Sequence, residues 1–407
     1  MAAPEAADCI AIYAELLSNL RQLSVVASLP SHSDGTTSAS LSSDGLRLTV
    51  SHQGQTQEIK LPERPIASAL QVPEARSTEV SWRLRLPPLD QPPPRFTLED
   101  QPLPWNARDI QRGSAVTCRA CKASLINAGR IAEWKDLPSD NWAEMMEFWH
   151  CHKPVDHNNP SEGAEADGKT TNKGYGANNV ISAQQGIGLI DVTSFVLSTD
   201  DCSAVLYSTS SPEEESNGPD TGTLDTGATR FLHAYCKSCA VEVGVFNVAT
   251  EAVSLFKWSI SCATIRPGPL PDITECLAAT LMATISRSGS AKSIIAPHLI
   301  GRAGKTTGSR SLYIWVLNPN VVYAASKSAR DHHGSAMKLL FRSVPVEEGN
   351  EIVDAMNSDV QELTLPEAAI EAVAQELEAS NSLLPSREQL FQGWRVGLLH
   401  RWRLNDQ

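Results

Sequence analysis

Two Cys-x-x-Cys pairs constrain the fold of this chain more than any other feature of its sequence. Cys118 with Cys121, and Cys236 with Cys239, each offer two thiolates to one metal ion. Two such pairs complete a tetrahedral Cys₄ site of the kind that holds zinc. The stretch between the pairs, residues 122–235, is far longer than in a compact zinc finger. A shared ion would therefore join segments that are distant in sequence, and we expect it to act as a structural staple.

Two other interpretations of the pairs stay open at this stage: chance cysteines in two turns, and a redox-active dithiol. The redox interpretation is the weaker one, because neither pair lies at the start of a helix in a strand–helix–strand pattern. The chain has nine cysteines, an odd number, and its N-terminus lacks the basic region of a secretory signal. These features favour reduced thiols in the cytosol or nucleus, where metal ligation explains paired cysteines better than disulfides do.

The charge of the chain narrows the classes of partner. Its 407 residues carry a formal net charge of −13. Binding to a phosphate backbone requires clustered Lys and Arg, so we expect no direct nucleic-acid partner. No apolar stretch reaches the roughly 18 residues that a membrane span needs, so we expect no membrane partner either. The acidic balance suits a basic protein surface.

The first 95 residues read as a series of short strands. Alternating or β-branched apolar residues are separated by Gly- and Ser-rich turns, and no long helix intervenes, which is typical of a β-sandwich or an open barrel. We predict a mainly β protein on this basis. The predicted strands in this part are Ile10–Leu17, Leu20–Leu29, Leu46–Ser51, Gln57–Leu61 and Glu79–Leu86.

Composition divides the chain into three predicted parts. Residues 1–95 form an N-terminal β domain, which ends in a proline-rich connector. Residues 96–250 form a zinc-bearing core, and residues 251–407 form a C-terminal part of strands and helices. Two polar segments of the core, near 158–176 and 208–227, are nearly free of large apolar residues and are predicted to be disordered insertions.

After the second Cys pair the strand signal returns. The most apolar stretch, Leu312–Ala325, is interrupted by Asn318-Pro319-Asn320, so a β-hairpin with its turn at these residues is predicted. Further strands are predicted at Val241–Val248 and Val253–Ile265. Near the end, Pro366–Ala379 reads as an amphipathic helix. Thr364 and Glu367 have the spacing of a capping box for it, and its apolar face carries Ile370, Val373 and Leu377.

A heavy aromatic and thioether stripe follows the first Cys pair. With Ser139 as a plausible N-cap, Trp142, Met145, Met146 and Trp149 recur at helical spacing. Core packing explains such a stripe most simply. The sharper interpretation is a partner-binding surface that includes His152, because Met supplies adaptable contacts and Trp anchors interfaces.

The predicted helix runs into His150-Cys151-His152, which permits three interpretations. These side chains cap and pack the helix end, or they ligate a metal ion, or Cys151 is a reactive thiolate. A neighbouring imidazolium lowers the pKa of a thiol, and this favours a nucleophilic or acyl-carrying role for Cys151.

The order of the motifs along the chain provides a further clue. The first Cys pair is preceded by Leu103-Pro-Trp-Asn106 and followed by two motifs, Leu137-Pro-Ser139 and Trp149-His-Cys-His152. The second pair is followed by Val243-Gly244. The C-terminal part contains Gly393-Trp394-Arg-Val-Gly-Leu-Leu399. With this ordered set the chain resembles, over nearly its whole length, the HECT-like ubiquitin-conjugating-enzyme-binding proteins, a group of eukaryotic ubiquitin-protein ligases.

The resemblance implies that the chain binds a ubiquitin-conjugating enzyme and promotes ubiquitin transfer to protein substrates. Members of that family are also linked to stabilising the endonuclease of the pre-mRNA cleavage and polyadenylation machinery. The alternative expectation is therefore a non-catalytic, zinc-stabilised protein that protects such a client.

The cysteines do not match the mechanism of a true HECT ligase, which carries ubiquitin on a cysteine of its C-terminal lobe. No cysteine follows Cys276 here. A ubiquitin thioester would have to use a cysteine outside the two pairs, and Cys151 is the first choice because imidazoles flank it. The other candidates are Cys9, Cys202, Cys262 and Cys276. An adaptor that orients a charged conjugating enzyme would need no cysteine at all.

Overall fold

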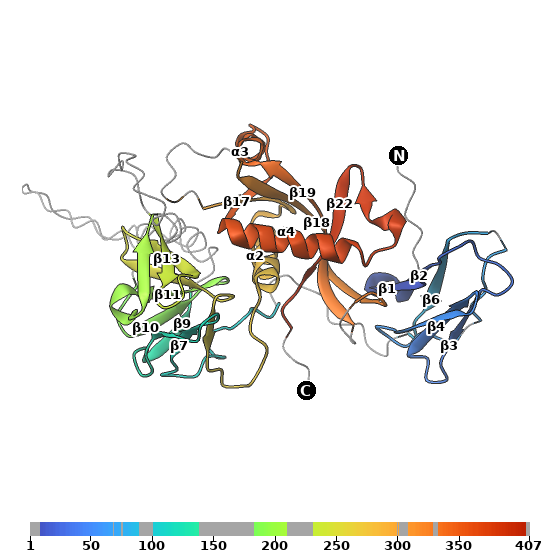
Figure 1. The fold of residues 1–407 in the computed structure, drawn as a ribbon, viewed down its shortest axis with the longest axis horizontal. Coiled ribbons are helices and arrows are strands. Elements are labelled where there is room, and N and C mark those ends of the chain that lie inside the picture. The colour runs from blue at the N-terminus through green and yellow to red at the C-terminus, as the bar shows by residue number, and fades with distance from the viewer. Residues whose placement is uncertain are drawn as a thin grey trace, which may run out of the picture. The chain divides into compact units, whose positions relative to one another are not determined.

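Two units make up the fold, one of residues 1–104 and 268–407 and the other of residues 105–267 (Figure 1). The structure is a computed structural model that describes residues 9–67, 69–74, 76–88, 101–137, 183–209, 231–298, 300, 308–328 and 333–403. Within these ranges strands far outnumber helices, which confirms the predicted mainly β class. The three-part division of the sequence stays a prediction.

A nine-stranded sheet organises the unit formed by residues 1–104 and 268–407. Its main path is β21-β22-β19-β18-β1-β2-β6, and β17 and β20 branch from β18. Tyr13 of β1 lies opposite Ala325 of β18, so segments about three hundred residues apart share one ladder. The strands are β1 Ala11–Leu17, β2 Gln22–Ser28, β6 Glu79–Arg85, β17 Lys292–Pro297, β18 Arg310–Ala325, β19 Gly334–Pro345, β20 Gln361–Leu365, β21 Leu390–Phe391 and β22 Trp394–His400.

An ion cluster ties the N-terminal strands to the C-terminal ones. The Lys338 ammonium of β19 lies 2.9 Å from a Glu15 carboxylate oxygen of β1 and 3.2 Å from Glu388. The Tyr13 hydroxyl donates to Glu15 over 2.9 Å. Glu15 is buried, and a buried carboxylate is tolerated only when it is paired in this way.

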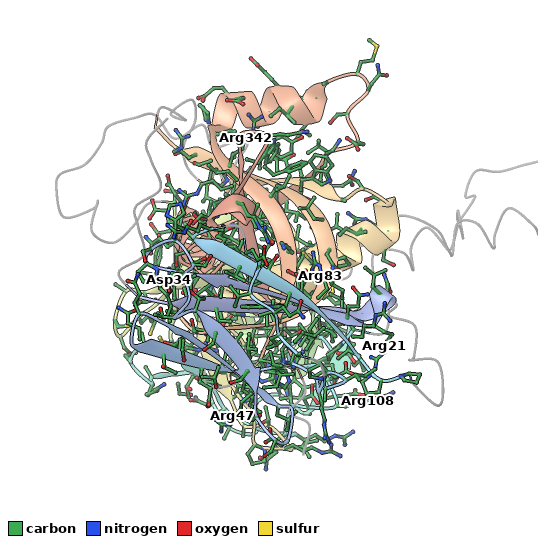
Figure 2. All side chains as sticks on the ribbon, turned by 90° about the vertical axis from the view of Figure 1, so that its right-hand side faces the viewer. Arg21, Asp34, Arg47, Arg83, Arg108 and Arg342 are labelled. Carbon is green, nitrogen blue, oxygen red and sulfur yellow. The ribbon has the colours of Figure 1, made fainter. Side chains whose placement is uncertain are left out.

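The N-terminal strands enclose a core to which Ala324 of β18 also belongs, as a sandwich or open barrel requires. Along β6 the side chains alternate: Val80, Trp82 and Leu84 are buried, and Arg83, labelled in Figure 2, is exposed between the last two. A second, three-stranded sheet joins the same core through residues such as Leu48 and Val50. Its strands are β3 Ser38–Leu41, β4 Arg47–His52 and β5 Gln55–Lys60.

The hairpin predicted within Leu312–Ala325 is wrong. Arg310–Ala325 is one strand, β18, and Asn318-Pro319-Asn320 lies within it as an irregularity of its pairing with β19. Proline has no N–H for a central ladder and is accommodated at a bulge. On its other edge β18 pairs first with β17 and then with β1, so the irregularity falls where its partner changes.

Three α-helices occur in the described residues: α2 Ile273–Ser288, α3 Val346–Asp354 and α4 Glu367–Asn381. α4 confirms the predicted C-terminal helix and buries Ile370, Val373 and Leu377. The predicted capping box is wrong, because Thr364 belongs to β20 and Pro366 caps α4 without a side-chain bond. None of the described helices is long and apolar enough to cross a membrane.

Helix α2 was not predicted from the sequence. It begins with a capping box in which Asp272 accepts from the Glu275 backbone and Glu275 accepts from the Asp272 backbone. The short 3-10 turns of the described chain are η1 Ser18–Leu20, η2 Thr199–Asp201 and η4 Ser386–Glu388.

The unit of residues 105–267 contains a seven-stranded sheet in the order β12-β13-β14-β15-β11-β10-β9 and a three-stranded sheet in the order β16-β7-β8. β9 and β10 are parallel, and the other pairs are antiparallel. The predicted strand Val253–Ile265 divides at a turn into β15 and β16, which belong to different sheets. The strands are β7 Val116–Cys118, β8 Ser124–Ile126, β9 Glu133–Asp136, β10 Ile187–Ile190, β11 Ser194–Ser198, β12 Val205–Ser208, β13 Phe231–Cys236, β14 Glu242–Asn247, β15 Ala252–Phe256 and β16 Ile260–Cys262.

Candidate metal centre

Each Cys-x-x-Cys pair forms the turn between two antiparallel strands of the 105–267 unit. The first turn joins β7 to β8 and the second joins β13 to β14. In the first, Lys122 N–H donates to the Cys118 carbonyl over 2.9 Å. In the second, Ala240 N–H donates to the Cys236 carbonyl over the same distance. The two turns therefore share one backbone geometry, although the cysteines are the only identical residues in them.

The residue after the second cysteine of each pair has a left-handed backbone. Lys122 has φ +65° and Ala240 has φ +59°. Glycine takes this conformation without penalty, whereas a residue with a Cβ atom pays roughly 1–2 kcal/mol. Strain of this kind persists where the surroundings hold the backbone in place, as the hydrogen bond that closes each turn does here.

The four thiols converge on one point, as predicted. The Sγ atoms of Cys118 and Cys239 are 3.7 Å apart, and those of Cys121 and Cys236 are 3.6 Å apart. All four Sγ atoms lie within 4.8 Å of one another, and the cysteines are not joined by disulfides. A tetrahedron with Zn–S bonds of about 2.3 Å has S···S edges of about 3.8 Å, so the cluster has the dimensions of a Cys₄ site.

The cluster is buried on one side and open on the other. Cys118 and Cys236 are buried, Cys239 is half-buried and Cys121 is exposed. Burial raises the pKa of the Cys118 thiol. The pKa of Cys121 is lowered to about 7, chiefly because the backbone N–H of Ala123 donates to its sulfur and also because Cys239 lies beside it. Backbone N–H groups directed at a sulfur stabilise the thiolate form that a metal ion requires.

Arg119, inside the first pair, fastens its turn to the turn between β15 and β16. Its backbone N–H donates to the Ser259 carbonyl over 2.9 Å. Its guanidinium donates to the carbonyls of Lys257 and Ile260 over 3.0 and 3.2 Å. Lys237, at the equivalent place in the second pair, donates its backbone N–H to Ala204 over 3.0 Å. Neither residue was predicted to have a role, although both pairs carry a basic residue after the first cysteine.

The remaining predicted site residues fall outside the described residues. This is the case for Cys151 and for the stripe with His152, which stay predictions; the stripe comprises Trp142, Met145, Met146 and Trp149. The predicted insertions near 158–176 and 208–227 also fall outside, except for residues 208 and 209 at the end of β12.

The described cysteines outside the cluster lack the features of an activated thiol. Burial raises the pKa of both Cys202 and Cys262 to about 12. Cys276 is fully buried on α2. Cys9 is exposed and makes no hydrogen bond or ion pair with the described residues.

Comparison with known proteins places this architecture in a family. The profile of the family described as "HECT-like Ubiquitin-conjugating enzyme (E2)-binding" matches residues 15–396, which include both Cys pairs and strands of every sheet. The chain belongs to this family. Membership of the HECT-like E2-binding family associates it with binding in the ubiquitin pathway.

Two curated relatives of this family member come from yeasts. The uncharacterized protein C1734.10c of Schizosaccharomyces pombe is 26% identical over 329 residues, which cover 76% of this chain and 81% of that protein. The uncharacterized protein YJR141W of Saccharomyces cerevisiae is 22% identical over 298 residues, which cover 72% and 71% of the two chains. No solved structure matches the chain.

Proposed function

We propose that the four cysteines hold one structural Zn²⁺ ion. The donor set is four sulfurs, the ligand type that zinc accepts in closed structural sites. Four protein ligands leave no open coordination position for a substrate, so the ion would stabilise the fold and take no part in the chemistry. Measuring metal content in the purified full chain tests this proposal, with about one zinc per chain as the expected result.

We further propose that the protein binds a ubiquitin-conjugating enzyme and promotes ubiquitin transfer to protein substrates. The observation that carries this proposal is the family match, because it extends over residues from both units and is described by its E2-binding activity. The Trp142–Trp149 stripe with His152 is the proposed docking surface. The cytosol or nucleus, where thiols stay reduced, is the proposed compartment.

Two modes of transfer are compatible with this proposal. In a covalent mode the Cys151 thiolate would attack the thioester carbonyl on the conjugating enzyme and release that enzyme's cysteine thiol. A substrate lysine amine would then attack the new thioester and regenerate the Cys151 thiol. In an adaptor mode the protein would orient the charged conjugating enzyme toward the lysine, and the rate gain would come from proximity alone.

A non-reducing gel assay distinguishes the two modes. Wild-type protein and Cys151→Ala are mixed with a ubiquitin-charged conjugating enzyme, with Cys202→Ala as the matched control. A reducible ubiquitin adduct that disappears only in Cys151→Ala supports the covalent mode. Faster ubiquitin discharge without an adduct, equal in the three proteins, supports the adaptor mode. If neither adduct nor faster discharge occurs with any of a panel of conjugating enzymes, the proposed transfer function is wrong.

A second candidate function is protection of a client protein without catalysis. The observation that favours it is the state of the described cysteines outside the cluster, since three of them are buried or have a raised pKa. The client implied by the family resemblance is the endonuclease that cleaves pre-mRNA before polyadenylation. Depletion of the protein should then lower client abundance, and a folded Cys151→Ala variant should restore it. Failure of that variant to restore the client would contradict a purely non-catalytic role.

A further inference from the structure

One cysteine of the four-sulfur cluster is open to solvent. Cys121 is exposed, whereas Cys239 is half-buried and Cys118 and Cys236 are buried. A cysteine that ligates a metal ion is a thiolate, which is the form of sulfur that peroxides oxidise. A small oxidant that reaches the cluster therefore has access to Cys121 before the other three cysteines.

A second sulfur lies within reach of Cys121 on the other turn. The Sγ atoms of Cys121 and Cys236 are 3.6 Å apart, although the two residues are separated by 115 positions in the sequence. The sulfurs of a disulfide are about 2.05 Å apart, so rotation about the side-chain bonds has to close only about 1.5 Å. A disulfide along this contact would connect the turn between β7 and β8 with the turn between β13 and β14, as the shared ion does.

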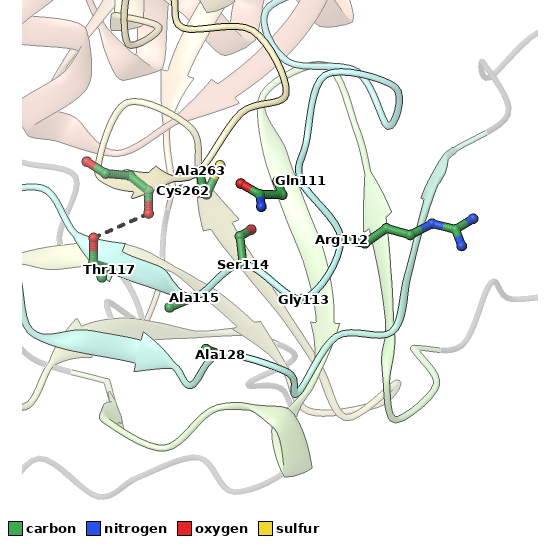
Figure 3. Close-up of a pocket in the computed structure, with 10 residues that line it drawn as sticks. Gln111, Arg112, Gly113, Ser114, Ala115, Thr117, Ala128, Cys262 and Ala263 are labelled. Atoms are coloured by element: carbon green, nitrogen blue, oxygen red, sulfur yellow. Dashed lines mark hydrogen bonds between the residues drawn. The ribbon is translucent and has the colours of Figure 1, made fainter.

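Backbone pairing fixes the position of both turns. In the ladder between β7 and β16, Ile260 lies opposite Cys118. The Thr117 hydroxyl donates to the Ser261 carbonyl over 3.3 Å in the same ladder (Figure 3). The second turn is held in a similar way, because β13 pairs with β12 and β14 pairs with β15. This pairing keeps the two sulfurs at their short distance during an oxidation that precedes loss of the ion.

The other described cysteines of this unit are protected from the same oxidation. Cys262 lies at a pocket of about 330 Å³ that is lined by residues of the loop 111–115 and of β16, so a small molecule can approach it (Figure 3). Burial raises the pKa of this thiol to about 12, so it stays protonated at pH 7 and reacts slowly with a peroxide. Burial has the same effect on the pKa of Cys202. Within the described part of this unit, oxidation is therefore directed to the cluster.

We propose that Cys121 is an oxidation site at which hydrogen peroxide replaces the metal cross-link by a disulfide between Cys121 and Cys236. In the first step the Cys121 thiolate attacks the peroxide, so that an S–O bond forms, the O–O bond breaks, and the released hydroxide takes up a proton. In the second step the Cys236 thiolate attacks the Cys121 sulfur, so that the S–S bond forms, the S–O bond breaks, and a second hydroxide takes up a proton. The inference rests on the proposed zinc site and is independent of ubiquitin transfer.

Two thiolates, one hydrogen peroxide and two protons thus give one disulfide and two water molecules. The sulfurs are oxidised and the peroxide is reduced. Of the cluster only Cys118 and Cys239 remain as ligands, and two thiolates are fewer than the four of a closed zinc site, so the ion leaves. A thiol reductant cleaves the disulfide and restores all four ligands. A disulfide within one Cys pair would instead leave the two turns unconnected.

Peroxide treatment of the zinc-loaded full chain tests the proposal. Released zinc is followed with a coloured chelator, and disulfides are mapped by mass spectrometry of unreduced peptides. We expect the release of zinc to parallel the formation of the Cys121–Cys236 disulfide, and reduction in the presence of zinc to reverse both. Zinc that stays bound while the exposed Cys9 is oxidised, or zinc that leaves with a disulfide inside one Cys pair, would overturn the proposal.

Zinc content measured before the peroxide is added separates this inference from the metal site on which it rests. A purified chain without zinc would refute the metal site and the inference together. A loaded chain that keeps its zinc in peroxide would refute the oxidation site alone.

Cys121→His separates metal ligation from oxidation. Histidine is a ligand in Cys₃His zinc sites but carries no sulfur, so this variant should bind zinc and release it at least about tenfold more slowly in peroxide. Cys9→Ser, which removes an exposed cysteine outside the cluster, is the matched control and should release zinc as fast as wild type. Release from Cys121→His at the wild-type rate would contradict the role of Cys121. If this variant binds no zinc, the disulfide map of the wild-type chain decides.

Hydrogen exchange tests whether the disulfide takes the place of the ion. Oxidised, zinc-free wild-type protein should keep the amide protection of β7 and β13, because the two turns are still joined. Removal of zinc by a chelator under reducing conditions should abolish that protection, since the energy of structural metal binding is folding energy. Equal loss of protection in the two treatments would refute the replacement of the ion by a disulfide.

Discussion

Replacing Cys118 by serine tests most directly whether a metal ion shared by the four cysteines stabilises the 105–267 unit. Cys118 is fully buried, and its sulfur is 3.7 Å from that of Cys239, which lies 121 residues further along the chain. Structural zinc binding is worth about 10–16 kcal/mol, so one of four ligands represents about 2.5–4 kcal/mol. A serine hydroxyl left buried without a partner adds about 1–3 kcal/mol. The expected loss of about 3.5–7 kcal/mol approaches or equals the whole stability of a marginally stable domain.

The expected result is therefore unfolding of one unit. The 105–267 unit should lose its metal and the amide protection of β7, β8, β13 and β14. The other unit has its own sheet and core, so β18 and β19 should keep their protection. Hydrogen-exchange mass spectrometry with metal quantification reads both outcomes in one sample. Cys202→Ser, at a half-buried cysteine of the same unit outside the cluster, is the matched control and should retain metal and protection.

Retention of metal would refute this reasoning. If Cys118→Ser binds about one zinc per chain and protects β7 and β13 as wild type does, Cys118 is not a ligand of a shared site. If both units lose amide protection equally, their stabilities are coupled. The loss of unfolding free energy could then not be assigned to the 105–267 unit alone.

Three further predictions address other parts of the molecule. Lys338→Met should lower the free energy of unfolding in urea by about 3 kcal/mol, because Glu15 is left as a buried charge without its cation. A change below about 0.5 kcal/mol would show that the Lys338–Glu15 ion pair does not matter for stability. Ala240→Gly should raise the unfolding midpoint of the metal-loaded protein by relieving the left-handed strain at φ +59°, and a lowered midpoint would refute that strain. Hydrogen bonds from the Thr36 side chain and from Gln53 lower the pKa of Asp34 (Figure 2) to about 2. The pKa of this carboxyl in the unfolded chain is about 4. Its contribution to the free energy of unfolding is therefore present above about pH 4 and is lost as the pH falls toward about 2. Asp34→Asn should flatten the acid side of the stability–pH profile, and an unchanged profile would contradict this assignment.

The sequence revealed those features that depend on local patterns. Cysteines at Cys-x-x-Cys spacing are typical of a shared metal site, so the clustering of these four cysteines could be predicted without a fold. The alternating apolar residues of Glu79–Leu86 identified the strand observed as β6, since strand periodicity is a property of the segment itself. The apolar face of α4 was found for the same reason.

Features that depend on distant partners could not be predicted. Nothing local to Tyr13 specifies pairing with Ala325. The signal of Asn318-Pro319-Asn320 favours a turn, yet the continuous pairing with β19 keeps β18 in one piece.

A direct affinity measurement tests the proposed binding of this protein to a ubiquitin-conjugating enzyme. Purified, metal-loaded full chain is titrated into a panel of conjugating enzymes, each uncharged and stably charged with ubiquitin. We expect at least one enzyme to bind with a dissociation constant in the micromolar range or tighter, which corresponds to about −8 kcal/mol of binding free energy. We also expect the folded double variant Trp142→Ala/Trp149→Ala to weaken that binding at least about tenfold, as loss of aromatic anchors does. Absence of binding across the panel by a folded, zinc-bearing protein would contradict the account.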